Sequence, residues 1–250
     1  MKNNNSNTSL KRGRPPKKDY DPEALMQELI DTAAEIYQEK REIKATALEL
    51  NLPPGKVKKL LITGNVLPYP ETKQIQGLMQ QGKNMAEIQH IMGLSYSALH
   101  TYLPYSKVIY KMSEISQNAE RVKTYKARKS VVDTLMAAPT KGHLWDCIVA
   151  FQNYSFYTVS GLPFSYTLKK GRNGEYTKEL FIDRRENSKS LAWSSVRMVF
   201  ERALEQQGAI FTRPKELVDV RGVSYTFSLL WRFGMISVPE EVEKKLKGNR

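Results

Sequence analysis

The feature that most constrains this fold is a pattern that occurs twice: a short segment with helical periodicity, a tight turn, and a second such segment. In the first copy, residues 43–62, the turn lies at residues 51–54, and in the second copy, residues 85–103, it lies at residues 93–95. Helices of this length are marginal in water on their own, so each must pack against neighbours. The pattern therefore predicts a mainly α-helical chain of closely packed short helices.

The two copies also share the spacing of their key positions. A small residue is expected where the two helices touch, a residue that tolerates a left-handed backbone in the turn, and two buried residues three apart in the second helix. These positions are Ala47, Asn51, Val57 and Leu60 in the first copy and Gln89, Gly93, Leu99 and Tyr102 in the second. Asn and Gly readily adopt the left-handed conformation, and Gln89 departs from the expected small type. An ordinary helical hairpin is the alternative for either copy taken alone.

Both segments resemble the helix-turn-helix of sigma-factor region 4 and of resolvase-type recombinases, over about 60 of the 250 residues. In such a motif the second helix lies in the major groove and its side chains contact base edges. The predicted DNA-contacting residues are Lys56, Lys58, Lys59 and Thr63 in the first copy and Ser95, Tyr96, Ser97, His100 and Thr101 in the second. A looser similarity to uncharacterised DNA-binding proteins of Firmicutes and their mobile elements rests on residues 59–63 and 97–105, and it implies no specific activity.

The net charge of +13 is unevenly distributed. The first 18 residues carry six bases and no acid, whereas residues 19–40 carry seven acids and one lysine. Within the first segment, Arg12-Gly13-Arg14-Pro15 resembles the core of an AT-hook. The resemblance implies that these four residues bind the minor groove of AT-rich DNA, where a narrow groove and strong negative potential attract arginine. The alternative is a tail that contacts phosphates without sequence preference.

A further basic cluster follows the second copy. Residues 105–130 carry seven bases and two acids, and a helical apolar stripe accompanies them. This pattern predicts either a helix whose basic face lies across phosphates or a solvated linker helix. The predicted phosphate contacts of the whole chain are Lys17, Lys18, Lys107, Arg121, Lys123, Lys126, Arg128, Lys129, Lys169, Lys170 and Arg172.

The last hundred residues are richer in aromatic side chains and predict a small α+β domain. A β-hairpin is expected, with strands at residues 164–168 and 179–183, and helices are expected at 143–151, 190–207 and 223–234. The predicted organisation is a disordered basic tail (1–20), a tandem helix-turn-helix domain (21–112), a basic connector helix (113–140), the α+β domain (141–239) and a charged tail (240–250). The α+β domain would contact DNA through its basic hairpin or serve oligomerisation or ligand sensing, and a homodimer through it is one expected partner.

Several function classes find no support in the residues. The three histidines and the single cysteine, Cys147, do not form a zinc ligand set, and no phosphate-binding Gly-Lys-Ser/Thr loop or Gly-x-Ser-x-Gly turn occurs. We therefore expect neither an enzyme nor a metal or cofactor. No apolar run is long enough to cross a membrane, and the polar, basic N-terminus is unlike a secretory signal. A cytoplasmic, nucleoid-associated protein is expected.

Taken together, these patterns predict a sequence-specific, double-stranded DNA-binding protein that acts as a transcriptional regulator. One alternative is an accessory protein in the replication, partition or recombination of a mobile element. A second is a protein-interaction adaptor whose helical hairpins bind protein rather than duplex DNA. The tail and the connector would supply affinity, and the nearly neutral second copy, above all residues 96–101, would supply specificity.

Overall fold

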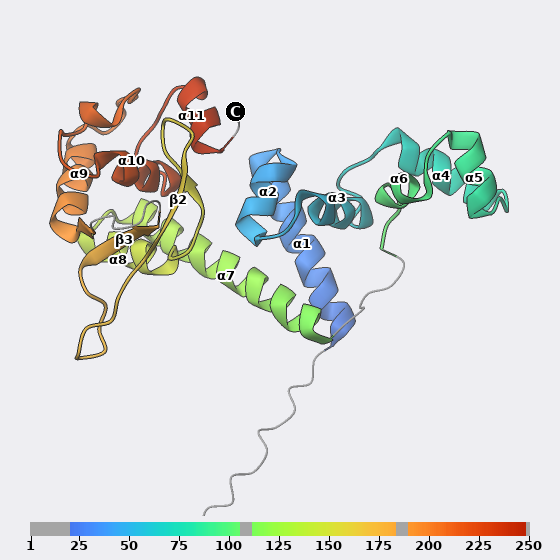
Figure 1. The fold of residues 1–250 in the computed structure, drawn as a ribbon, viewed down its shortest axis with the longest axis horizontal. Coiled ribbons are helices and arrows are strands. Elements are labelled where there is room, and N and C mark those ends of the chain that lie inside the picture. The colour runs from blue at the N-terminus through green and yellow to red at the C-terminus, as the bar shows by residue number, and fades with distance from the viewer. Residues whose placement is uncertain (1–20, 106–111, 184–189, 249–250) are drawn as a thin grey trace, which may run out of the picture.

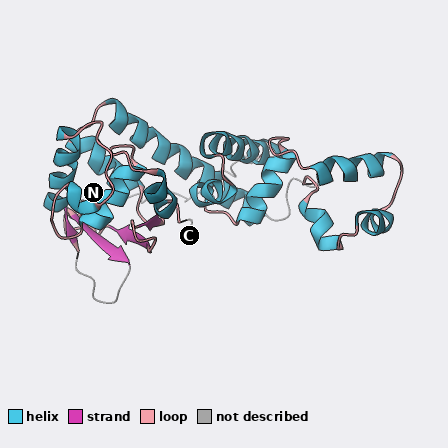
Figure 2. Cartoon of the chain, turned by 90° about the horizontal axis from the view of Figure 1, so that it is seen from above, coloured by secondary structure: helices cyan, strands magenta, loops and turns pink. Residues whose placement is uncertain are grey.

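The computed structural model describes residues 21–105, 112–183 and 190–248. Within them the chain is mainly α-helical, with one small antiparallel sheet of four short strands in the C-terminal part, so the predicted fold class is confirmed at this level. Three groups of elements lie in a row: α4–α6 at one end, α1–α3 in the middle, and the sheet with α8–α11 at the other end (Figures 1 and 2). The long helix α7 runs from the middle group into the C-terminal group.

Both predicted helix-turn-helix segments are helical, and a further helix precedes each of them. The helices are α1 (Pro22–Lys40), α2 (Ile43–Leu50), α3 (Pro54–Thr63), α4 (Pro70–Gln80), α5 (Met85–Met92), α6 (Tyr96–Thr101), α7 (Met112–Ala137), α8 (Lys141–Ala150), α9 (Trp193–Glu205), α10 (Val223–Arg232) and α11 (Glu240–Leu246). The strands are β1 (Phe156–Tyr157), β2 (Pro163–Thr167), β3 (Glu179–Asp183) and β4 (Leu191–Ala192), and η1 (Pro214–Glu216) is a short 3-10 helix.

In the first unit, α1–α3, the apolar faces of the three helices pack against one another. The Asp21 side chain accepts hydrogen bonds from the first turn of α1, where Pro22 has no N–H group that would need an acceptor. Asn51 ends α2 with φ 49° and ψ 51°, which is the left-handed turn that the sequence predicts. Val57 and Leu60 then point from α3 into a core that also includes Ile36 of α1.

The second unit, α4–α6, contains a helix that the sequence pattern did not assign. Ile75 of α4 packs against Ile88 of α5 and Leu99 of α6, and all three side chains are fully buried. Gly93 makes the turn with φ 63°, and the Ser95 side chain accepts a hydrogen bond from the backbone of α6. α6 ends at Thr101, two residues earlier than the pattern predicts. Because α5 and α6 alone cannot enclose a core, α4 completes the unit.

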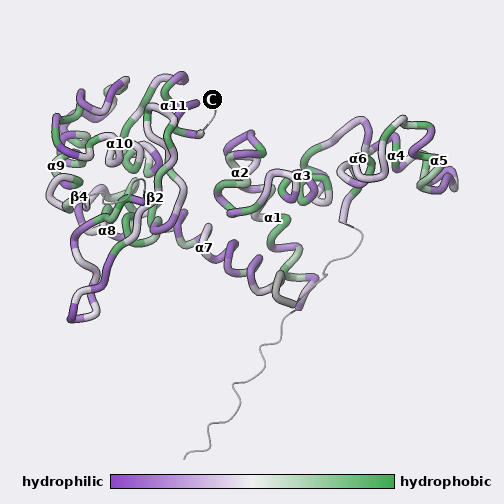
Figure 3. Tube along the Cα trace, in the orientation of Figure 1, coloured by the Kyte–Doolittle hydropathy of each residue, from purple (hydrophilic) through white to green (hydrophobic). Residues whose placement is uncertain are grey.

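Helix α7 belongs to two hydrophobic cores and is more than a connector. Val122 and Tyr125 are buried against the first unit, whereas Val132 and Leu135 are buried in the C-terminal core. The outer turns of α7 are hydrophilic, and hydrophobic segments gather in α8 and the neighbouring sheet (Figure 3). The expectation of a solvated linker helix is therefore wrong, because both halves of α7 bury apolar side chains.

The C-terminal part packs helices on an antiparallel sheet of order β1-β2-β3-β4. β2 and β3 form the predicted hairpin, with Tyr166 opposite Ile182, and both of these side chains point into the core. Aromatic rings dominate this core; Phe151, Phe200 and Phe233 are each at most 1% exposed. Burial of large aromatic side chains supplies much of the apolar area that stabilises a domain of this size.

Two boundaries in this part differ from the prediction. Leu191 and Ala192 pair with β3 as strand β4, so α9 begins at Trp193 and not at residue 190. Residues 240–246 form α11, although a charged tail is predicted there, because Val242 and Leu246 lie four residues apart and are both buried. Three acids in its first turn and two lysines in its last turn also suit the helix dipole.

The single cysteine supplies a probe of the folded state. Cys147 of α8 is fully buried, its Sγ donates to the Val131 carbonyl at 3.3 Å, and burial raises the pKa of its thiol to about 12. Because the thiolate is the reactive form, we expect Cys147 in the native protein to react with an aromatic disulfide reagent at pH 8 on the order of a thousandfold more slowly than in urea. Stopped-flow absorbance measures both rates; equal rates would show that the thiol is accessible in the native state.

Candidate functional site

The surface of α6 presents a short polar face to solvent. Tyr96 is 57% exposed, and Ser97 and Thr101 are also exposed. The Tyr96 ring rests against the His100 ring with their centroids 4.3 Å apart, and the Nε2 atom of His100 is buried and has no hydrogen-bond partner among the described residues. Ser95 is occupied as the helix cap. In this conformation Tyr96 and Ser97 are thus the predicted residues best placed to meet a ligand.

The corresponding surface of α3 is largely occupied by contacts within the protein. The Nζ atom of Lys58 lies 4.3 Å from the ring centroid of Tyr69 and 4.2 Å from that of Tyr102, which joins the two units. Lys59 lies over the Tyr105 ring at 5.0 Å. The Thr63 hydroxyl donates to the Lys59 carbonyl and accepts from the Tyr105 backbone N–H. Of the four residues predicted on α3, Lys56 is the one classed as exposed.

The acidic helix α1 pairs with the basic helix α7. Lys126 binds Glu28 at 2.8 Å and Lys129 binds Glu35 at 2.5 Å, and these hydrogen bonds raise the pKa of each lysine. Both pairs are solvent-exposed and contribute little to stability. Two charge clusters that are separate in the sequence therefore face each other across a helix pair, so α7 presents less free positive charge than its sequence indicates.

Arg128 of α7 donates to the carbonyls of Ala150 and Gln152, and the other predicted DNA-contacting residues fall into three groups. On α7, the Nε atom of Arg121 donates to the Asn51 carbonyl at 3.2 Å, and Lys123 is exposed. On the β2–β3 hairpin, Lys169 lies over the Phe181 ring, Lys170 lies over the Tyr176 ring and Arg172 is exposed in the turn. The residues that lie outside the described ranges are Arg12, Gly13, Arg14, Pro15, Lys17, Lys18 and Lys107.

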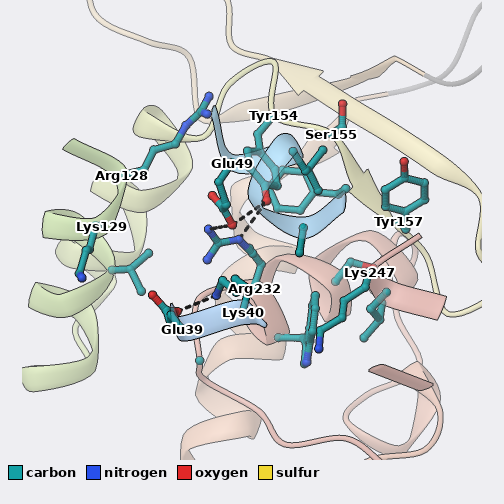
Figure 4. Close-up of a pocket in the computed structure, with 18 of the residues that line it drawn as sticks. Glu39, Lys40, Glu49, Arg128, Lys129, Tyr154, Ser155, Tyr157, Arg232 and Lys247 are labelled. Atoms are coloured by element: carbon teal, nitrogen blue, oxygen red, sulfur yellow. Dashed lines mark hydrogen bonds and ion pairs between the residues drawn. The ribbon is translucent and has the colours of Figure 1, made fainter. Parts of the chain in front are cut away.

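One buried polar cluster was not predicted from the sequence. Glu49 of α2, Arg232 of α10 and Tyr154, which precedes β1, meet where the first unit packs on the C-terminal part (Figure 4). Arg232 donates to Glu49 at 2.5 Å, and the Tyr154 hydroxyl donates to the same Glu49 oxygen at 3.2 Å. The exposed fraction is 4% for the Glu49 side chain and 18% for that of Arg232. Because the three residues lie far apart in the chain, no local pattern signals the cluster.

Burial changes the pKa values of residues in and beside this cluster. It raises the pKa of Tyr154 to about 12. For Arg232, burial by itself lowers the pKa, but the contacts with Tyr154 and Glu49 outweigh it and keep the pKa above its usual value. Arg128 of α7 is half-buried beside the cluster, and burial lowers its pKa. The contacts with Tyr154 and Glu49 thus stabilise the charged form of Arg232 despite its burial.

A cavity of about 630 Å³ adjoins the cluster, and it is enclosed by α1, α2, α7, β1, α10 and α11. Aromatic side chains line one side, and several charged side chains lie around it (Figure 4). One lining residue has an unpartnered polar atom: the Oε2 atom of Glu49 is buried and accepts no hydrogen bond within the described residues. This volume falls in the range of small-molecule sites.

Two kinds of functional element are absent from the described residues. No group of three or more His, Cys, Asp or Glu side chains is placed there to hold a metal ion. None of the described helices combines the length and apolar character needed to cross a bilayer. Comparison with family models, with curated proteins and with solved structures yields no match for this chain.

Proposed function

We propose that this chain is a sequence-specific double-stranded DNA-binding protein in which α6 reads the major groove. The observation that supports this most directly is the second unit: three helices around one small core, with a left-handed Gly93 turn and the exposed residues Tyr96 and Ser97 on its last helix. This is the arrangement of a helix-turn-helix, in which exposed side chains of the second helix contact base edges. Hydroxyl groups such as these accept from and donate to bases.

The two copies of the motif would then have different roles. On α3, Lys58 lies between Tyr69 and Tyr102, and Thr63 bonds within the protein, so this copy holds the second unit in place. On α6, the corresponding face is open to solvent. We therefore assign base recognition to α6 and phosphate contacts to exposed residues such as Lys56, Lys123 and Arg172. The tail, with its AT-hook-like core, would add minor-groove affinity for AT-rich DNA.

Within this proposal, we favour transcriptional regulation as the biological role. Accessory action at a mobile element is the alternative. Promoter sites in a map of genomic binding would support regulation, and sites at an origin or at element ends would support the mobile-element role. An adaptor that binds protein alone predicts no duplex binding at physiological salt. A nucleoid location and a homodimer through the C-terminal part are further predictions of the same kind.

Removal of two hydroxyl groups from α6 tests the assignment. Sites selected from a random pool of duplexes by the full chain provide the reference sequence. We expect the double variant Tyr96→Phe, Ser97→Ala to lower the affinity ratio between the selected site and a scrambled site on the order of tenfold, since a good base contact contributes about 1–3 kcal/mol of discrimination. Phe at position 96 keeps the ring against His100, so packing is preserved. Fluorescence anisotropy measures both affinities.

A matched control lies on the neighbouring helix of the same unit. Gln74 and Gln76 of α4 are exposed, and the double variant Gln74→Ala, Gln76→Ala removes two polar groups away from α6. Its affinity ratio should stay within about twofold of the parent, as expected for exposed substitutions that touch no special feature. An unchanged ratio in the α6 variant, or an equal fall in the control, would move base recognition away from α6.

A further inference from the structure

One residue of the cavity wall, Glu49, has a carboxylate oxygen that lacks a hydrogen-bond donor within the described residues. Glu49 uses Oε1 for both Arg232 and Tyr154, whereas Oε2 is buried and unpartnered within the described residues. Burial of a polar atom without a hydrogen bond is unfavourable, more so for a charged group. The guanidinium groups of Arg232 and Arg128 already lie beside this carboxylate, so a third cation next to it would be repelled. A neutral N–H group therefore suits Oε2 best.

The other lining residues indicate the chemical class of such a ligand. Tyr125, Tyr154 and Tyr157 line it together with Phe156 and Trp231, which favours a planar ring. Arg128 also lines it and donates to two carbonyl oxygens, those of Ala150 and Gln152, while no carboxylate lies within ion-pair distance of it in the described part of the chain. A half-buried guanidinium without a carboxylate partner can donate to a carbonyl or phosphate oxygen of a ligand.

We propose that this cavity binds a nucleobase-containing ligand, with an N–H group of the base donating to the Oε2 atom of Glu49. A base supplies a planar ring, an N–H donor and acceptor atoms within one small framework. The volume of about 630 Å³ is sufficient for a ligand of this size. Lys40 and Lys247 also line the cavity, where they pair with Glu39 and Glu243, and a phosphate group of a nucleotide would compete with these carboxylates for them.

Titration calorimetry with the full chain tests the proposal, with GMP, AMP, UMP and inorganic phosphate as probes. We expect at least one nucleotide to bind in a 1:1 ratio and phosphate alone not to compete with it. Binding by none of the three nucleotides would overturn the proposal, and so would equal binding of phosphate, because the base would then not be recognised. The titration contains no DNA, so its result is independent of the proposed DNA-binding function.

Three variants locate the site. Glu49→Gln places an amide where the carboxylate acceptor lies, and we expect it to weaken nucleotide binding at least about tenfold. Ser155→Trp adds bulk at an exposed cavity residue while it leaves the three-residue cluster intact, and it should weaken binding similarly even if Glu49→Gln unfolds the chain. Glu205→Gln removes an exposed carboxylate of α9, which does not line the cavity, and should bind within about twofold of the parent. Unchanged affinity in Ser155→Trp would place the ligand elsewhere.

Discussion

The variant Arg232→Met is expected to lower the free energy of unfolding by about 3–5 kcal/mol, the usual effect of removing one partner from a buried ion pair. It leaves the Glu49 carboxylate almost fully enclosed, with the Tyr154 hydroxyl as its remaining donor. The guanidinium of Arg232 also lies 5.2 Å from the ring centroid of Phe151, so its packing is lost as well. Urea unfolding followed by circular dichroism measures the change.

The double variant Glu49→Leu, Arg232→Met separates the ion pair from the packing. Replacement of both partners by apolar residues is often neutral, because no charge is then left buried. We therefore expect the double variant to be more stable than Arg232→Met alone, which a double-mutant cycle expresses as a coupling energy. Glu39→Gln, an exposed carboxylate, should change the stability by at most about 0.5 kcal/mol. A loss below about 1 kcal/mol in Arg232→Met would show that the cluster does not hold α2 on the C-terminal part.

The second large effect is expected from the basic tail. The double variant Arg12→Ala, Arg14→Ala removes two cations from the Arg-Gly-Arg-Pro core. We expect the slope of log affinity against log salt concentration to decrease in magnitude by about 2. Across a fourfold change in salt, this difference in slope corresponds to a factor on the order of ten in affinity. If the tail lies in a narrow minor groove, the loss should also be larger on AT-rich than on GC-rich duplexes. Fluorescence anisotropy on both duplexes at several salt concentrations provides the measurement.

Lys17→Ala, Lys18→Ala is the matched control, because it removes the same charge from the same tail outside that core. It should flatten the salt dependence equally while it leaves the preference for AT-rich DNA unchanged. If the arginine and lysine variants behave alike on both duplexes, the tail contacts phosphates only. If neither changes the salt dependence, the tail does not contact DNA.

The short helices of the first half were accessible from the sequence because local signals define them. Asn51 and Gly93 are residue types that adopt the left-handed conformation, and each ends its helix where the spacing predicts. The β2–β3 hairpin was likewise predicted from alternation and a polar turn. In contrast, α4 and α11 went unassigned because their apolar residues are few and their polar residues many. Each of these helices is stabilised by burial of its apolar residues: Ile75 of α4 in the core of the second unit, and Val242 and Leu246 of α11 in the C-terminal core.

The charged residues show most clearly which properties can be predicted from the sequence and which depend on the tertiary structure. The sequence by itself determined the number of charges and their order along the chain, and hence the expectation of a polyanionic partner. Only the tertiary structure decided which cations are free: it pairs Lys126 and Lys129 with acids of α1 and places Lys58 between two tyrosine rings. It also brings Glu49 to Arg232 across 183 residues. The physical reason is that electrostatic contacts depend on distance in space and on burial, and neither quantity is encoded in the local spacing of residues.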